Sequence, residues 1–256
     1  MESGGGFDLP NEMLAAIESY MLPADRQAMA QVNHLYHEEL SGTVVVQSDE
    51  EIVAALTNPN VRIIAIRPLH THMVCLNGTS HAEIFADGTG LTGRLIVRAE
   101  VEVYARNDAV VAATAGVVHA GDNADLQLSD SARGTAHGTA RVDAMGSSSV
   151  SAFGQSYVAA SDTCYVEAVE SSLVHARDYA QVTAFHNSHV LVTGNSAVEA
   201  HDAVRVKADD HARVRVHGTG VRVYIRDDSA VTIEGVSEED AATVILRGQW
   251  PNDWNY

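Results

Sequence analysis

The chain has 256 residues, with 34 acidic and 16 basic side chains, which gives a formal net charge of −18. This acidity argues against a general surface for nucleic acid or anionic membranes. Aromatic residues make up only 5% of the chain, so a thick aromatic core is excluded and a thin, β-rich fold is favoured. The two cysteines imply no disulfide framework, and the sequence shows neither a signal-peptide pattern nor a long apolar run. We therefore expect a protein of the cytoplasm or nucleus.

The sequence pattern of residues 7–40 predicts two or three short helices. Pro10 suits the first position of a helix, and apolar side chains then recur at helical spacing. Pro23 interrupts the pattern, and Asp25 can cap a second helix. Forty residues bury little surface on their own, so we expect these apolar faces to meet another surface.

The order of these residues resembles the F-box family. The matching segments are Leu9-Pro10-Asn11-Glu12-Met13-Leu14, Ile17, Ser19-Tyr20-Met21, Asp25 and Val32-Asn33-His34-Leu35-Tyr36. Departures are Met21, Arg26, Ala28 and Tyr36, which stand where the family more often has leucine or tryptophan. The resemblance implies docking onto a Skp-type adaptor of a cullin–RING ubiquitin ligase. The implied adaptor-binding residues are Leu9, Pro10, Leu14, Ile17 and Met21. The alternative is a helical cap on the following domain.

A second domain is predicted to begin at residue 43, which divides the chain into residues 1–42 and 43–256. Residues 43–46 are a β-branched run that reads as a strand. Ser48 and Glu51 form a capping-box pattern at the start of a short helix, and residues 61–66 read as the next strand. A helix in this place would cover the open first coil of a parallel β-helix.

The rest of the domain repeats with a period of eight. Valine occupies every eighth position from Val142 to Val214, and alanine or valine follows two positions later each time. With this valine as position three, positions one, three and five alternate with polar residues, and position seven carries turn residues. Each octad is therefore one short strand plus one corner, which predicts a mainly β fold, a parallel β-solenoid. Towards the N-terminus the pattern continues less regularly through Leu126/Leu128, Val118/Ala120 and Val110/Ala112. After Val214 it slips by one residue, to Val223/Ile225 and then Val231/Ile233.

Position six predicts how many octads form one coil. In every second octad it holds Phe153, Val169, Phe185, His201 and His217, whereas the octads between have Ser161, Arg177, Thr193 and Asp209. A period of sixteen favours two octads per coil, with a coil of 24 residues as the alternative. The tail at Trp250–Trp254 is expected to cover the last coil.

Several acidic residues and histidines near the corners could belong to an enzymatic or metal site, or they could be ordinary turn residues. In a coil of sixteen, Asp162 and Asp178 would stack about 4.8 Å apart, near the spacing of a glycosidase pair, but turn capping explains them better. His201 and His217 would also stack, with Asp202 adjacent, although zinc needs three or four convergent ligands. We expect no enzyme, no cofactor and no metal.

The predicted target-binding surface consists of aromatic and apolar residues at otherwise polar positions of the repeat: Phe153, Tyr157, Tyr165, Val169, Tyr179 and Phe185. The alternative is that the position-six column turns inward and belongs to the core. Two functional hypotheses follow. The first is an F-box-like substrate adaptor, in a eukaryote or in a virus or bacterial effector acting in host cells. The second is an acidic structural or DNA-mimicking rod, and a carbohydrate-active β-helix is a weaker third.

Overall fold

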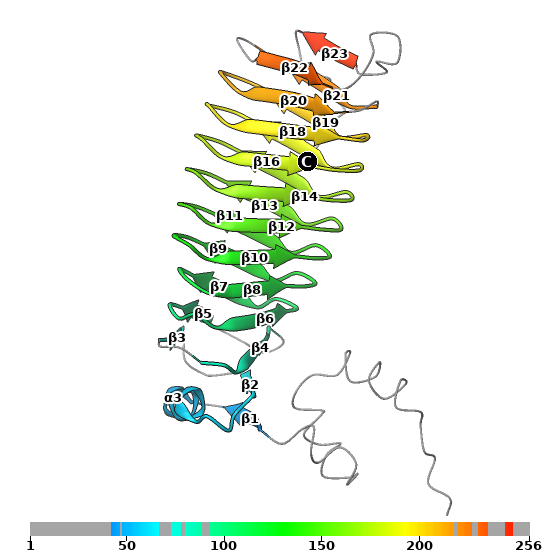
Figure 1. Ribbon diagram of the computed structural model, residues 1–256. Coiled ribbons are helices and arrows are strands. Elements are labelled where there is room, and N and C mark those ends of the chain that lie inside the picture. Colours follow the sequence, from blue (N-terminus) through cyan, green and yellow to red (C-terminus); the bar gives the residue numbers. More distant parts are fainter. Residues whose placement is uncertain are drawn as a thin grey trace, which may run out of the picture.

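The computed structural model describes residues 42–46, 48–66, 73–77, 80–88, 93–217, 220–226, 230–234 and 244–247. They form a parallel β-solenoid in which each coil adds one strand to each of two facing sheets (Figure 1). Sheet A contains β1 (Thr43–Val46), β2 (Ile63–Ile66), β4 (Glu83–Asp87), β6 (Glu102–Arg106), β8 (Val117–Ala120), β10 (Arg133–Ala136), β12 (Ser149–Ala152), β14 (Tyr165–Ala168), β16 (Gln181–Ala184), β18 (Ala197–His201), β20 (Arg213–His217) and β22 (Ala230–Glu234). Sheet B contains β3 (Met73–Leu76), β5 (Arg94–Val97), β7 (Val110–Ala113), β9 (Asp125–Leu128), β11 (Arg141–Ala144), β13 (Tyr157–Ala160), β15 (Leu173–Ala176), β17 (His189–Val192), β19 (Arg205–Ala208), β21 (Arg222–Ile225) and β23 (Val244–Arg247).

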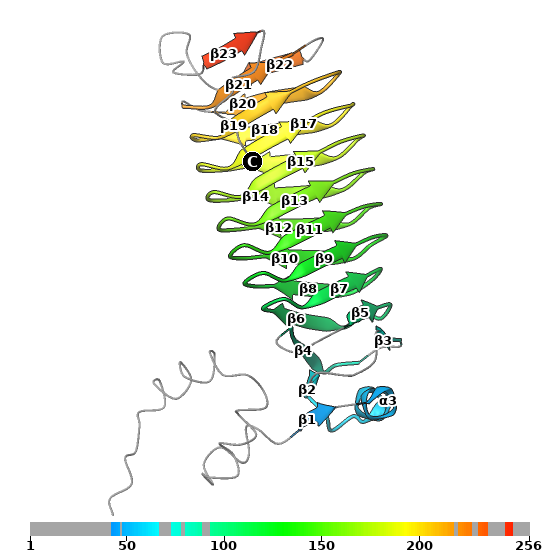
Figure 2. The same ribbon diagram turned by 180° about the vertical axis from the view of Figure 1, so that it is seen from behind.

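The strand register confirms a coil of 16 residues rather than 24. In sheet A, Val150 of β12 pairs with Val166 of β14, and in sheet B, Val142 of β11 pairs with Val158 of β13. Chemically equivalent positions therefore lie above one another in every coil. Figure 2 shows the same stack of strands from behind.

Positions one, three and five fill the narrow space between the sheets. Val174, Ala176 and Ala180 are fully buried, and the equivalent residues of neighbouring coils are buried in the same way. Small side chains suit this place because the two sheets of a two-stranded coil approach closely. Burial of valine contributes about 1.5–3 kcal/mol each before the entropy of ordering is subtracted.

Two shifts in register occur, one at each end of the regular repeat. The expectation that Val110 and Ala112 point inward was wrong: Val111 and Ala113 are buried instead. The physical reason is a shorter corner between β7 and β8, because a change of one residue moves every side chain of a strand to the other face. After Val214 the register lengthens to 17, with Val214 paired to Val231, as predicted.

Helix α3 (Asp49–Thr57) confirms the predicted cap between the first two strands. Ser48 is its N-cap, and the Ser48 side chain accepts a hydrogen bond from the backbone N–H of Glu51 at 3.2 Å. Ile52 and Ala55 are buried in the core cluster. The helix stands where sheet B would otherwise have its first strand, beside the edge of β3 (Figure 1).

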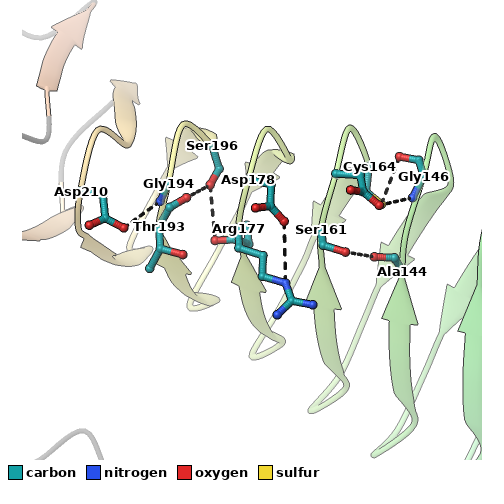
Figure 3. A network of polar contacts seen from close by, with 12 residues as sticks. Ala144, Gly146, Ser161, Cys164, Arg177, Asp178, Thr193, Gly194, Ser196 and Asp210 are labelled. Carbon is teal, nitrogen blue, oxygen red and sulfur yellow. Dashed lines mark hydrogen bonds and ion pairs between the residues drawn. The ribbon is translucent and has the colours of Figure 1, made fainter.

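The corners share one backbone conformation. From Asp122 to Asp210 every eighth residue, at position seven, has a positive φ between 54° and 69°. Aspartate and glycine recur there because they tolerate this left-handed region better than other residues do. The carboxylates also cap the coil below: Asp210 accepts a hydrogen bond from the N–H of Gly194 at 3.1 Å (Figure 3).

The predicted adaptor-binding residues Leu9, Pro10, Leu14, Ile17 and Met21 lie outside the described residues, as does the tail at 250–254. Among the residues that the structure describes, no helix is long and apolar enough to cross a membrane.

Candidate functional site

The position-six residues at the corners that lead from sheet A to sheet B form one column, which we call the edge column. It consists of His137, Phe153, Val169, Phe185, His201 and His217. Neighbouring rings stack: the centroids of His137 and Phe153 are 4.8 Å apart, and those of Phe185 and His201 are also 4.8 Å apart. Its members are partly or fully exposed and do not belong to the core cluster. The column is therefore a surface feature and not part of the core.

The outer face of sheet B continues this apolar surface across three strands. The outward positions two and four of β13, β15 and β17 hold Tyr157, Ala159, Leu173, His175, His189 and Leu191, which we call the sheet-B patch. Each of these side chains is half-buried among its neighbours. The corresponding positions of β12, β14 and β16 in sheet A hold Ser149, Ser151, Tyr165, Glu167, Gln181 and Thr183. Over these three coils the two outer faces therefore differ: that of sheet B is largely apolar and that of sheet A is largely polar.

The structure brings four of the six predicted target-binding residues to one side of the molecule. Phe153, Val169 and Phe185 belong to the edge column, and Tyr157 follows the same kind of corner at the start of β13. Tyr165 is the first residue of β14, directly after the opposite corner, where the chain passes from sheet B to sheet A, and Tyr179 lies in such a corner. Both are exposed, at 44% and 63%, and the Tyr165 hydroxyl donates to Thr183 Oγ1 at 3.1 Å.

Sequence reasoning missed Leu173, His175, His189 and Leu191. The outward positions look variable when all octads are compared together. The signal is found only when alternate octads are read separately, since one set faces out of sheet A and the other out of sheet B.

The two histidines of the sheet-B patch are kept in their neutral form by their surroundings. Burial lowers the pKa of His175 below 6.5, and the nearby charge of Arg177 lowers it further. Burial and then Arg205 lower the pKa of His189 in the same way. His175 lies in register between Ala159 and Leu191, so apolar neighbours on both sides explain the loss of solvation. At neutral pH the patch therefore carries little charge of its own.

A second group of stacked rings lies on sheet A near its N-terminal end. The rings of Phe85, Tyr104 and His119 stack at centroid distances of 4.7 and 4.8 Å. Glu102 accepts a hydrogen bond from the Tyr104 hydroxyl at 2.8 Å, and it lies 2.9 Å from His119 Nε2. Burial and this carboxylate raise the pKa of Tyr104 to about 12. Glu102 also lines a shallow depression of about 290 Å³ together with Glu83 and Glu100. These partners satisfy one another, and the group lies on the outer face of sheet A.

Asp162 and Asp178, the two carboxylates with the spacing of a glycosidase pair, lie in the corners of the coils. Asp162 Oδ2 accepts a hydrogen bond from the N–H of Gly146 at 3.0 Å. Figure 3 shows the contact of Asp178 with Arg177, in which Asp178 Oδ2 lies 3.9 Å from Arg177 Nε. Both residues have the positive φ of position seven. Backbone capping therefore accounts for Asp162, and tolerance of the positive φ accounts for aspartate at both positions.

The stacked histidines His201 and His217 have an acidic neighbour that differs from the one predicted. Their ring centroids are 4.7 Å apart, and the third group within reach is Glu199, not Asp202. Asp202 instead accepts a hydrogen bond from the N–H of His186 at 3.3 Å. The signal in the sequence was the spacing of two between Glu199 and His201, which places both on the same face of β18.

Comparison with protein-family models, curated proteins and solved structures finds no match to this chain. The F-box resemblance of residues 7–40 therefore has no support from the family models and stays a prediction.

Proposed function

We propose that this chain is a non-enzymatic interaction protein, in which the solenoid binds a target protein and the N-terminal segment links that target to a Skp-type adaptor of a ubiquitin ligase. The observation that carries the proposal is the apolar surface formed by the edge column and the sheet-B patch. The proposed target-binding residues are thus Phe153, Tyr157, Val169 and Phe185 together with the missed members of the patch.

The composition of this surface supports a protein partner. Aromatic and aliphatic side chains that stay half-exposed can bury further area against a partner, and they are typical of binding hot spots. A uniformly acidic rod that mimics DNA would instead need carboxylates over this face. Here Leu173 lies in one coil and Phe185 and Leu191 lie in the next, and the outward positions of β13, β15 and β17 hold no carboxylate.

The rigidity of the scaffold also favours binding. Parallel strands hold the outward side chains in fixed register from coil to coil, with Leu173 paired to His189 and His175 paired to Leu191. Little backbone order has to be gained when a partner docks, so the entropic cost of association falls mainly on side chains.

The adaptor half of the proposal rests on the F-box resemblance alone. Its implied contacts, Leu9, Pro10, Leu14, Ile17 and Met21, would form a small apolar patch that orders on binding and carries most of the affinity.

The two halves can be tested separately in a binding assay with a purified Skp-type adaptor and by proximity cross-linking of targets. Pro10→Ala with Leu14→Ala should abolish adaptor binding and leave the β-rich circular dichroism unchanged. Phe153→Ser with Leu173→Ser should abolish target cross-linking and leave adaptor binding intact.

Tyr165→Ser is the matched control for the target surface, because Tyr165 occupies position two like Leu173 but faces out of the polar sheet A. Target binding should survive this change. Absence of any affinity for Skp-type adaptors would refute the adaptor half, and loss of target binding in Tyr165→Ser alone would refute the assigned surface. If the apolar surface served self-association instead, wild type would be a dimer in analytical ultracentrifugation and Phe153→Ser with Leu173→Ser a monomer.

A further inference from the structure

Three potential metal ligands converge at the C-terminal part of the edge column. Glu199, His201 and His217 each offer one ligand atom, and these atoms all lie within 4.8 Å of one another. We propose that the three side chains form a surface binding site for a divalent transition-metal ion, of which Zn²⁺ is the representative. The inference does not rest on the proposed function, because none of the three ligands is among the proposed target-binding residues.

The backbone holds the three groups on one face. β18 and β20 are neighbouring parallel strands of sheet A, with His201 in register with His217. Glu199 precedes His201 by two residues, so both side chains leave β18 on the outer face of the sheet. The two imidazole rings lie nearly parallel, at an interplanar angle of 12°. The solenoid therefore brings the ligands together without help from a metal ion.

The three ligands suit a divalent cation that is intermediate between hard and soft. Two imidazole nitrogens and one carboxylate oxygen are ligands of catalytic-type zinc sites, in which the fourth position stays open. Imidazole also suits Cu²⁺ and Ni²⁺, whereas Mg²⁺ and Ca²⁺ prefer oxygen ligands. With metal–ligand distances of about 2.0–2.2 Å, the ligand atoms must approach one another by roughly 1 Å. All three side chains are half-exposed, so rotation of the side chains can supply this movement.

One competitor for the carboxylate is present. The guanidinium of Arg215 donates to Glu199 Oε1 at 2.7 Å, and the two side chains are 50% and 45% exposed. Exposed ion pairs of this kind are weak, and a metal ion can use the second carboxylate oxygen or displace the arginine. Removal of Arg215 should consequently strengthen metal binding, which is a signature that incidental histidine binding would not share.

The experiment is titration of the full, tag-free, chelator-treated chain with Zn²⁺ in an isothermal calorimeter. His201→Asn and His217→Asn should each weaken the strongest site by at least about tenfold, since loss of an outer-shell partner alone typically costs this much. Glu199→Gln should also weaken the site, and Arg215→Gln should tighten it. With Cu²⁺, electron paramagnetic resonance should show two coordinating nitrogens, reduced to one in either histidine variant.

His137→Asn is the matched control, because His137 occupies the same column and stacks on Phe153 but is not part of the ligand cluster. Its affinity for Zn²⁺ should equal that of wild type. Circular dichroism of each variant establishes that the solenoid is intact, and His217→Gln replaces His217→Asn if the latter fails to fold. The proposal is overturned if wild type binds no Zn²⁺ near 1:1 stoichiometry, or if the two histidine variants bind as tightly as His137→Asn.

Discussion

Gly134 and Leu128 occupy one shared volume between the sheets, and this pairing predicts a compensating double mutation. Gly134 stands at position three of its octad, in register between Val118 and Val150. Leu128 is fully buried at position five, where the next octads have Ala136 and Ala144. A Cβ atom built on Gly134 would lie only 2.5 Å from Leu128 Cδ1. The larger residue on one strand thus fills the space that glycine leaves on the other.

The magnitudes follow from this geometry. Leu128→Ala removes three carbon atoms, worth about 2.4 kcal/mol at roughly 0.8 kcal/mol each, and the remaining cavity brings the cost to about 2–5 kcal/mol. Gly134→Val adds three carbon atoms into occupied space and should cost about 1–3 kcal/mol or more. The double variant conserves the number of carbon atoms and restores the residues most common at both positions. We expect it to lie within about 1.5 kcal/mol of wild type.

Urea denaturation followed by far-UV circular dichroism, arranged as a double-mutant cycle, measures the coupling. The expected coupling is a rescue of about 2 kcal/mol or more. As a control, Leu128→Ala combined with the remote Val190→Ala should be additive within about 0.5 kcal/mol. Additive losses for Gly134→Val and Leu128→Ala would refute the inference that the two residues share one volume.

Two further predictions concern burial in the regular coils. Val174→Asp places a charge at a fully buried position and should unfold the solenoid. His175→Asp places a carboxylate on the outer face, near the charge of Arg177, and should leave the solenoid folded with a much smaller loss in the free energy of unfolding. Equal melting of both variants would contradict the inward and outward assignment. The hydroxyls of Ser156 and Ser172 are buried and find no hydrogen-bond partner among the residues that the structure describes, so alanine at either position should be neutral or stabilising. The Ser188 hydroxyl donates a hydrogen bond to the Phe185 carbonyl at 2.9 Å, so Ser188→Ala should lower the free energy of unfolding by about 1 kcal/mol. Thermal melts in which Ser188→Ala is the most stable of the three alanine variants would refute this reasoning.

The solenoid was predictable because the narrow interior selects the same small apolar side chains at equivalent positions of every coil. From Val142 to Val214 each position-three valine pairs with a valine of the next coil in the same sheet, so a single chemical preference is repeated along the chain and becomes visible as the period of eight. The period of sixteen was visible in Phe153, Val169 and Phe185 because the two kinds of corner have different surroundings. The capping box at Ser48 was equally local, since its hydrogen bond spans only three residues.

The features that were not predicted depend on local changes in the corners and on the winding of the coils, which hardly alter the sequence repeat. The corner between β7 and β8 is one residue shorter, and this shift turned Val110 outward although its sequence fits either phase. The separation of Tyr165 and Tyr179 from the other predicted residues became clear only from the winding of the coils. Glu199 was missed as a neighbour of His201 and His217 because Asp202 is adjacent to His201 in the sequence, whereas the Asp202 carboxylate caps the corner of the preceding coil.

The neutral histidines of the sheet-B patch predict a direction for the pH dependence of stability. The folded-state pKa values of His175 and His189 lie below 6.5, so the unfolded chain binds protons more readily than the folded one. Their contribution to stability is therefore complete above about pH 6.5 and is lost as the pH falls below this value, until the folded-state pKa values are passed. A partner that covers the patch would lower these pKa values further, and its binding should weaken over the same interval.

The measurement compares the urea midpoints of wild type and of His175→Asn with His189→Asn at about pH 7.5 and about pH 5.5. Asparagine keeps a polar side chain of similar reach but does not titrate, so acidification should destabilise wild type more than the double variant. His137→Asn serves as the control, because it removes a histidine from the edge column and leaves the sheet-B patch intact. A wild-type protein that became more stable than the double variant on acidification would reverse the sign and show that the folded patch favours charged imidazoles.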